Sequence, residues 1–285
     1  CSYYWSKCVF ELIAGTKRLA LSSPIVMGIL NVTPDSFSDG GQYSSYELAC
    51  QHADDMVAQG AGMIDIGGES TRPGAAEVSL ADELARVIPL VKYVATHHDV
   101  WISVDTSKAE VMRQAVAAGA HLINDVRALM EPGALEAAAE LHVPICLMHM
   151  QGEPKNMQSS PTYYDVIQEV SGFLTERIDA CIQAGIPREL LILDPGFGFG
   201  KSLEHNYELL AKLDSFTKFD LPVLIGLSRK SMIGNLLAKP TSERLAGSLA
   251  GAMIAAQKGA HIIRVHDVAE TVDMLKVLQA TQAYF

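Results

Sequence analysis

The sequence predicts an α/β protein, a single (β/α)8 TIM barrel over residues 1–285 with an N-terminal β-hairpin. Short apolar runs alternate with longer segments of helical periodicity, which is typical of βα units. Hydrophobic residues make up 49% of the chain, enough for one large buried core. No linker or low-complexity stretch divides the sequence, which favours one barrel over two domains.

The first element precedes the barrel. Residues 8–21 (CVFELIAGTKRLAL) predict a β-hairpin that turns near Ala14-Gly15-Thr16. Because the hairpin comes directly before the first barrel strand, we expect it to close the N-terminal end of the barrel.

Eight apolar runs then predict strands that are buried on both faces. They span residues 25–32, 63–68, 101–106, 122–126, 144–149, 190–195, 223–228 and 261–266. Between them, segments with a 3.6-residue apolar period predict helices, among them 46–59, 80–96, 108–118, 164–184 and 243–258. The segment 247–256 is rich in small residues, which indicates close helix packing or a dimer interface.

The residues that introduce the strands alternate in kind. The second, fourth, sixth and eighth strands follow a glycine at the end of a helical segment, which predicts the left-handed C′ position. These glycines are Gly60, Gly119, Gly185 and Gly259. The first, fifth and seventh strands open with Pro24, Pro144 and Pro222. This alternation supports eight strands in one barrel.

Composition excludes several classes of function. A net charge of −11 argues against a broad basic surface for nucleic acid or anionic lipid. No apolar run approaches the ~20 residues of a membrane span, and no secretory signal pattern is present. The five cysteines form no C-x-x-C pair and mostly lie in apolar segments. They predict reduced core thiols in a cytoplasmic protein.

Polar residues collect where the predicted strands end, which is the functional face of such a barrel. They are Asn31, Asp105, Asn124, Asp125, Asp194, Lys230, Arg264 and His266. Each alone could cap a helix, and for Asp105 or Asn124 this explanation is as good as a functional one, but the set at one rim indicates a binding site. Its carboxylates and amide suit a flat nitrogen heterocycle. Its basic groups, together with Arg72, suit phosphate or pyrophosphate.

Three loops at this face are rich in glycine and small polar residues. Residues 33–43 and 69–79 are long for βα loops and predict mobile lids. Residues 194–201 (DPGFGFGK) lack both the Walker and the dinucleotide-binding spacing. Their glycines predict a backbone that passes close to a ligand, with Phe197 and Phe199 as apolar surface.

At this point the motifs match a known family. The matching stretches are MGILNVTPDSFSDGG (27–41), DIGGESTRPGA (65–75), SVDTSK (103–108), INDV (123–126), MHMQGEPKNMQ (148–158), DPGFGFGK (194–201), GLSRKSMIG (226–234), ERLAGSLA (243–250) and IIRVHDV (262–268). In this order and spacing, the chain resembles the dihydropteroate synthase family of pterin-binding barrels. The resemblance implies a transferase of folate biosynthesis that is a target of sulfonamides. Its substrates would be 6-hydroxymethyl-7,8-dihydropterin pyrophosphate and p-aminobenzoate, and its products 7,8-dihydropteroate and pyrophosphate.

The resemblance also implies a role for each matching residue. The pterin would be held by Asp105, Asn124, Met148, Asp194 and Lys230. The pyrophosphate would meet Arg72, Arg264 and His266, with Asn31 near a Mg2+ cofactor. The aminobenzoate would lie near Thr71, Pro73, Gly198, Phe199, Lys230 and Ser231. Asp39 and Phe37 would complete the site from the first loop. Catalytic roles would fall to Asp39, Asp105, Asp194 and Lys230, and the protein would be a homodimer.

In this family the C–O bond of the pterin substrate is thought to break largely before the new C–N bond forms. Mg2+ and the basic residues would then stabilise the leaving group, and the carboxylates the pterin cation. Three alternatives stay open: a corrinoid methyltransferase on the same barrel, an aldolase with Lys230 as Schiff base, and a pterin-binding paralogue without activity. The first has no need of Arg72, Arg264 and His266.

Overall fold

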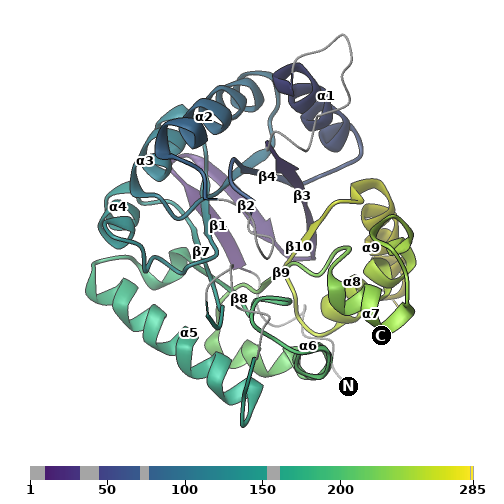
Figure 1. The fold of residues 1–285 in the computed structure, drawn as a ribbon. Coiled ribbons are helices and arrows are strands. Elements are labelled where there is room, and N and C mark those ends of the chain that lie inside the picture. Colours follow the sequence, from purple (N-terminus) through teal and green to yellow (C-terminus); the bar gives the residue numbers. More distant parts are fainter. Residues whose placement is uncertain (1–9, 33–44, 71–76, 153–160, 283, 285) are drawn as a thin grey trace.

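Parallel pairing joins the predicted barrel strands in one sheet. The structure is a computed structural model that describes residues 10–32, 45–70, 77–152, 161–282 and 284. The eight-stranded sheet has the order β8-β7-β6-β5-β4-β3-β10-β9. A parallel bridge between Leu193 and Val223 joins the two outer strands and closes the sheet. Helices surround this ring of strands (Figure 1), so the (β/α)8 prediction is confirmed.

The barrel strands are β3 (Ile25–Asn31), β4 (Met63–Gly67), β5 (Trp101–Asp105), β6 (Leu122–Asp125), β7 (Ile145–Met148), β8 (Leu191–Asp194), β9 (Leu224–Ile225) and β10 (Ile262–Val265). The helices are α1 (Ser45–Ala58), α2 (Leu80–His97), α3 (Ala109–Ala118), α4 (Ala134–Leu141), α5 (Val166–Gln183), α6 (Leu203–Ala211), α7 (Ser231–Leu237), α8 (Leu245–Gln257) and α9 (Val268–Gln282). Every residue of β4 and β5 is buried, as expected for strands with helices on one face and the barrel interior on the other.

The seventh barrel strand is shorter than the predicted 223–228. The chain leaves the sheet after Ile225, and a turn follows in which the Lys230 N–H donates to the Leu227 carbonyl at 3.2 Å. Arg229 adopts a left-handed φ of 57° in this turn. The apolar pattern extended the strand too far because residues 226–228 are buried without continuing the ladder.

The capping predictions are confirmed. Gly60, Gly119, Gly185 and Gly259 all have positive φ, between 89° and 117°, at the ends of α1, α3, α5 and α8. At its N-terminus, α6 has a capping box in which the Ser202 hydroxyl accepts from the His205 N–H. This cap fixes the start of α6 directly after the glycine-rich segment.

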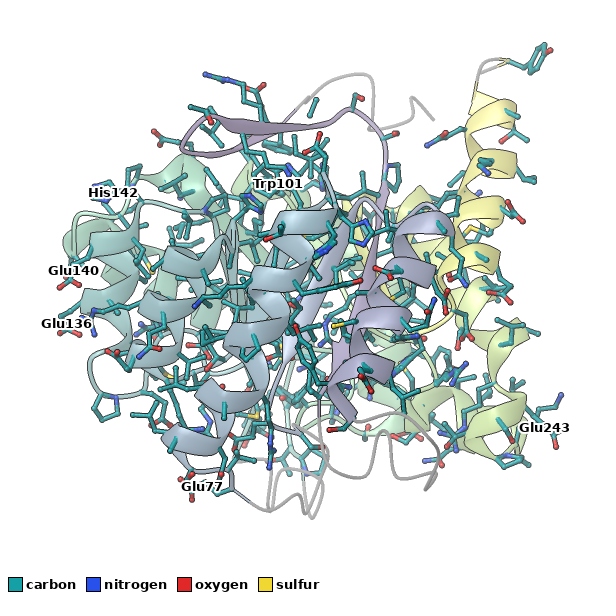
Figure 2. The ribbon with its side chains drawn as sticks, turned by 90° about the horizontal axis from the view of Figure 1, so that it is seen from above. Glu77, Trp101, Glu136, Glu140, His142 and Glu243 are labelled. Atoms are coloured by element: carbon teal, nitrogen blue, oxygen red, sulfur yellow. The ribbon has the colours of Figure 1, made fainter. Side chains whose placement is uncertain are left out.

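The hairpin prediction is also confirmed. Strands β1 (Phe10–Ala14) and β2 (Lys17–Leu21) pair antiparallel, and Leu12 and Leu21 are buried. The Lys17 ammonium donates to the carbonyl of Val100, which precedes β5, at 2.9 Å. Figure 2 shows the hairpin across the end of the barrel next to Trp101, with Glu77 and Glu243 at the opposite end. It therefore covers the N-terminal ends of the strands and leaves the other end to the site.

The described cysteines, Cys50, Cys146 and Cys181, are buried and unbridged, in agreement with core thiols. Cys1 and Cys8 lie outside the described residues. Within the described part of the chain, no helix combines the length and the apolar character that crossing a membrane requires.

Two histidines at the hairpin end make stability depend on pH. The Nδ1 of His261 lies 3.1 Å from the Val223 N–H, and the Nδ1 of His121 lies 3.1 Å from the Ile102 N–H, so both rings accept from a strand. Burial lowers the pKa of each to about 4. Since the unfolded pKa is about 6.5, protons bind preferentially to the unfolded chain as the pH falls from about 6.5 to about 4.

We therefore expect the free energy of unfolding to fall over that window, by up to about 3 kcal/mol from His261. His261→Asn retains an acceptor near the Nδ1 position but cannot titrate. Urea unfolding at several pH values should give a weaker pH dependence for this variant than for the wild type. An unchanged slope would exclude His261 as a source of the effect.

Candidate active site

The carboxyl ends of the strands bring polar side chains together at the end of the barrel opposite the hairpin. Asn31 and Asp105 end β3 and β5, Asn124 and Asp125 end β6, and Asp194 ends β8. Arg264 is in β10, and His266 follows it. Parallel strands make this common location unavoidable, and it is where barrel enzymes place their sites.

An arginine crosses the barrel interior to two carboxylates. The Arg264 Nε lies 2.6 Å from Asp65 Oδ2, and its Nη2 lies 2.9 Å from Asp105 Oδ2. Asn124 donates to the same Asp65 oxygen at 3.1 Å. Asp65, Asp105 and Asn124 are buried, and 18% of the Arg264 side chain is exposed. Asp65 thus links residues that the sequence assigned separately to a heterocycle and to an anion.

In this cluster, burial and the neighbouring charges act in opposite directions on the pKa values of Asp105 and Arg264. Burial raises the pKa of Asp105 to about 7, with Arg264 opposing the rise and Asp65 adding to it. Burial acts to lower the pKa of Arg264, but Asp65 and Asp105 outweigh it and raise that pKa. Arg264 is therefore a permanent cation, whereas Asp105 responds to a ligand that donates hydrogen bonds to its carboxylate.

The Lys230 side chain packs against the glycine-rich segment 194–201. Its ammonium donates to the Phe197 carbonyl at 2.5 Å and lies 4.4 Å from the centre of the Phe199 ring. Gly198 has a φ of +77°, and a Cβ there would lie 3.1 Å from Lys230 Cδ. Only glycine fits both conditions without displacing the lysine. Desolvation lowers the pKa of Lys230 to about 8, and Asp194 opposes this fall.

Asp194 begins the same segment. One of its carboxylate oxygens accepts from the Gly196 N–H at 2.8 Å. Burial raises the pKa of Asp194, and Lys230 acts in the opposite direction. The carboxylate is thus buried at 6% exposure between a backbone donor and a nearby ammonium.

The mouth of the barrel also has an apolar wall. Val126, Met148 and Phe199 are buried together in a small cluster that is separate from the main core, and Met150 packs against it. Buried carboxylates beside a compact apolar surface suit a flat polar ring. Met148 and Phe199, two of the predicted ligand contacts, therefore lie together in this wall.

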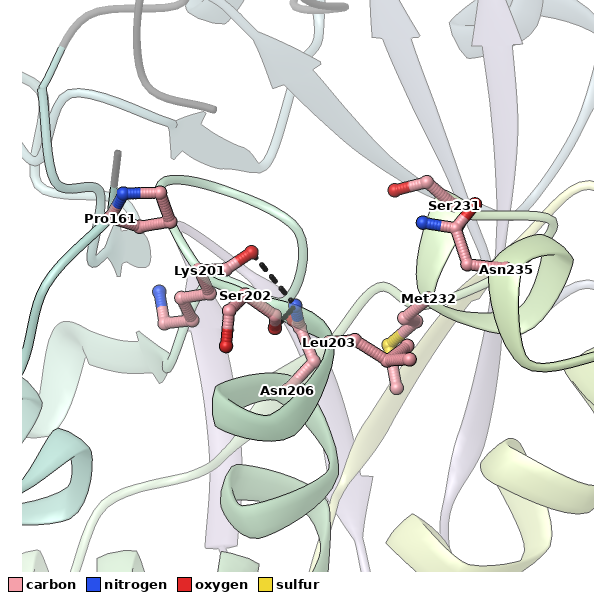
Figure 3. A pocket seen from close by; sticks show the side chains of 8 residues that line it. All are labelled: Pro161, Lys201, Ser202, Leu203, Asn206, Ser231, Met232 and Asn235. Atoms are coloured by element: carbon pink, nitrogen blue, oxygen red, sulfur yellow. Dashed lines mark hydrogen bonds between the residues drawn. The ribbon is translucent and has the colours of Figure 1, made fainter. Parts of the chain in front are cut away.

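The remaining described candidates lie around this centre. His266 Nδ1 is 3.1 Å from the Ser228 hydroxyl, which also accepts from the His266 backbone N–H at 3.2 Å. Ser231 is exposed at the first position of α7. Figure 3 shows it beside a cavity of about 230 Å³ between the starts of α6 and α7. Arg229 forms an ion pair with Asp267, which engages its charge outside the cluster.

Several predicted residues lie outside the described part of the chain: Phe37, Asp39, Thr71, Arg72 and Pro73. The base of the second loop is described and firmly anchored. The Lys108 Nζ lies 2.5 Å from Glu69 Oε2 and 2.6 Å from Oε2 of the buried Glu83. The Arg86 guanidinium donates to the Gly68 carbonyl at 2.9 Å. The strand end that leads to Thr71 is therefore tied to α2 and α3.

Sequence reasoning missed Asp65, Glu83, Lys108 and Lys201 as residues of the site's support. A signal existed for Asp65 and Lys201. Asp65 is a charge within the apolar run MIDIG, and Lys201 is the cation that ends DPGFGFGK. Buried charges need partners, so each predicts an opposite or polar group nearby. The identity of those partners depends on the barrel closure.

The described residues suit a metal ion that a substrate brings with it. No cluster of three or more His, Cys, Asp or Glu side chains in the described ranges could hold a metal. Asn31 is half-buried at the end of β3 and offers one amide oxygen. Mg2+ commonly takes one or two protein oxygens and fills its shell with water and phosphate oxygens. A single Asn31 ligand fits that pattern.

Comparisons with known proteins identify the family of this chain. The family model described as pterin binding enzyme matches residues 27–266. The dihydropteroate synthase of Escherichia coli K12 is 62% identical over 271 residues, which cover 95% of this chain and 96% of the relative. The chain belongs to the dihydropteroate synthase family.

Solved structures of dihydropteroate synthases share the fold. The Yersinia pestis enzyme in a sulfonamide drug complex has a TM-score of 0.92 and 58% identity, over 96% of this chain and 100% of that chain. The Xanthomonas albilineans enzyme with 4-aminobenzoic acid has a TM-score of 0.92 and 52% identity, over 96% and 99%. The match spans the barrel and its rim.

The Asp65 cluster predicts a loss of stability in Asp65→Ala. This change removes the acceptor that Arg264 and Asn124 share, and hydrogen bonds to charged groups contribute about 1.5–3 kcal/mol each. We expect the free energy of unfolding to fall by about 2 kcal/mol or more in guanidinium titrations. Asp214→Ala removes an exposed carboxylate 3.8 Å from Lys258 and should change it little. Equal effects in the two variants would contradict the assigned role of Asp65.

Proposed function

We propose that the chain condenses 6-hydroxymethyl-7,8-dihydropterin pyrophosphate with p-aminobenzoate to give 7,8-dihydropteroate and pyrophosphate. The observation that carries this proposal is the buried cluster of Asp65, Asp105, Asn124 and Arg264 beside the wall of Met148 and Phe199. Membership of the dihydropteroate synthase family supports the same reaction.

The pterin ring supplies what the buried acids lack. Its amino group and ring N–H donors pair with Asp105 and Asp194, and its acceptors pair with Asn124 and Lys230. Burial without such donors raises the pKa of both carboxyl groups. Binding the ring therefore stabilises their ionised forms, and these in turn stabilise positive charge that develops on the pterin.

The bond to be broken joins the exocyclic carbon of the pterin to a pyrophosphate oxygen. Its electron pair leaves with pyrophosphate, next to Arg264 and His266, with Arg72 contributing from the second loop. When bound, Mg2+ neutralises charge on the departing phosphates, and Asn31 is its proposed protein ligand.

The nucleophile is an arylamine, which is already neutral at pH 7. It attacks the exocyclic carbon from the side of Phe199 and Lys230, near Thr71, Pro73, Gly198 and Ser231, and then loses one proton to solvent or pyrophosphate. No strong base is needed. Lys230 donates to the Phe197 carbonyl and lies over the Phe199 ring. It therefore acts as a cation that orients the pterin ring, which disfavours a Schiff-base role.

We further propose a homodimer in the cytoplasm. Large apolar side chains are exposed on three neighbouring helices: Leu236 and Leu237 on α7, Ile254 on α8 and Val277 on α9. The small residues of α8 support packing within the chain, since a Cβ at Gly251 would lie 2.7 Å from Leu227 Cδ1. Buried free thiols support a reducing compartment.

Pyrophosphate release tests the reaction. The purified protein, Mg2+ and both substrates should yield pyrophosphate and dihydropteroate in equal amounts, and omission of either substrate should abolish release. Asp194→Ala removes a carboxylate that is ionised in the pterin complex, and we expect turnover to fall by at least ~100-fold. Near-normal kcat and KM in Asp194→Ala would overturn the assignment. Tight pterin binding without release by the wild type would favour the methyltransferase or the inactive paralogue.

Light scattering tests the dimer. The wild type should have twice the mass of one chain, and Ile254→Glu should shift it toward the monomer because it places a charge on the apolar face of α8. Tyr164→Glu introduces the same charge at another exposed apolar side chain, away from these helices, and should leave the mass unchanged. A monomeric wild type would contradict the proposal.

A further inference from the structure

Lys201 is a buried cation without an ion-pair partner among the described residues. It is 2% exposed, and no carboxylate of the described chain lies within 4.0 Å of its ammonium. Lysine is almost never so buried unless its charge is compensated, because removing an ammonium from water is costly. Its hydrogen-bond partners here are uncharged, and Asp194 stabilises its charge only from a greater distance, which points to a specific role for the lysine.

The Lys201 nitrogen donates to two carbonyls and lies within hydrogen-bond distance of a third group. The three groups are the Gly196 carbonyl at 2.7 Å, the Phe199 carbonyl at 3.2 Å and the His149 Nδ1 at 2.9 Å. An ammonium has three N–H donors, so all of them are used, whereas a neutral amine has only two. Burial lowers the pKa of Lys201 to about 7, which Asp194 opposes, and the protonated form is the one whose donors match all three groups.

His149 is the fixed partner in this arrangement. It follows Met148 at the end of β7, its backbone N–H donates to the Asp194 carbonyl at 2.9 Å, and its ring packs edge-on against Phe173. Burial and the nearby Lys201 lower the pKa of His149 to about 2, so its ring stays neutral, and the tautomer without a hydrogen at Nδ1 accepts from a protonated Lys201. His149 thus connects the segment after β8 to the neighbouring strand.

The chain from Gly196 to Gly200 wraps closely around this pair. Gly196 has a φ of +74°, and a Cβ there would lie 1.8 Å from the His149 carbonyl oxygen. Outside Lys201, the Gly198 N–H donates to Asn206 at 2.7 Å, and the Gly200 carbonyl accepts from Tyr163 at 2.7 Å. In Figure 3, Asn206 also holds the Lys201 backbone, and the lysine side chain points away from Ser231.

The face of this segment toward the barrel mouth carries site residues. Phe199 supplies the apolar wall under Lys230, and Gly198 lies against the Lys230 stem. Lys201 contacts the same backbone through the Gly196 and Phe199 carbonyls. Its charge also opposes the rise that burial causes in the pKa of Asp194. The lysine therefore acts on both ends of the segment, and it also lines the cavity beside Ser231.

We propose that Lys201, together with His149, is a positioning residue that holds residues 194–200 in the conformation that binds the arylamine and the pterin. The proposal rests on the proposed function for its kinetic consequences. Its structural consequence, a more open segment when the ammonium is removed, does not depend on activity.

The test replaces Lys201 by Met, which keeps the length and the apolar stem but removes the three donors. Hydrogen exchange of peptides that span 194–200 should speed up in Lys201→Met. Displacement of Phe199 should lower kcat/KM for p-aminobenzoate by an order of magnitude or more, mainly through KM. Lys212→Met is the matched control, because Lys212 is an exposed lysine paired with Glu208 on the surface of the same region.

The readouts separate the possible failures. Unchanged exchange and unchanged KM in Lys201→Met would overturn the proposal. A wild type that releases no pyrophosphate would overturn the proposed function, and the exchange comparison would still decide the role of Lys201. If Lys201→Met does not fold, His149→Phe keeps an aromatic ring and removes one acceptor. It should shift exchange and KM in the same direction by a smaller factor, and wild-type values there would also overturn the proposal.

Discussion

The ion pairs of Arg264 with Asp65 and Asp105 are the interaction on which the rest of the site depends. They join β10, β4 and β5 across the interior of the barrel, where a lone charge would be strongly unfavourable. One arginine cannot fully neutralise two buried carboxylates, so the cluster keeps a surplus of acceptors. A heterocycle with several N–H donors removes that surplus, which makes the affinity for such a ring a consequence of the barrel interior.

The two ends of the barrel divide the work of stability and chemistry. The hairpin covers the N-terminal ends of the strands, and neutral histidines accept from the strands there. At the carboxyl end, charged side chains replace this apolar closure. Their support comes from outside the ring of strands: Glu83 and Lys108 hold the start of the second loop, and Lys201 and His149 hold the segment after β8. Rigid supports of this kind allow loops to carry binding residues without losing their geometry.

The glycine-rich segment shows how backbone and side chains share one function. Its glycines permit positive φ and close approach to the His149 carbonyl and the Lys230 stem. The same openness leaves carbonyl groups without partners in a ladder, and Lys201 and Lys230 supply the donors. The segment is therefore ordered by two lysines on opposite sides, one within the fold and one in the site.

The strand and helix order, the hairpin and the rim of polar residues could all be predicted from the amino-acid sequence. These follow from local periodicity, capping glycines and the rule that parallel strands end together, all of which are readable over a few residues. Its family motifs also identified the chemistry. The predicted extent of β9, residues 223–228, was wrong because an apolar pattern alone does not distinguish a strand from a buried turn such as 226–230.

The connections between the site residues depend on the three-dimensional fold. Asp65 and Arg264 are 199 residues apart in sequence, and Lys201 and His149 are 52 apart, so no local pattern pairs them. Their contacts exist because β4 and β10 flank β3, and β7 pairs with β8, once the barrel closes. Long-range electrostatic partners are fixed by this closure, which is why the charges could be predicted as functional while their partners could not.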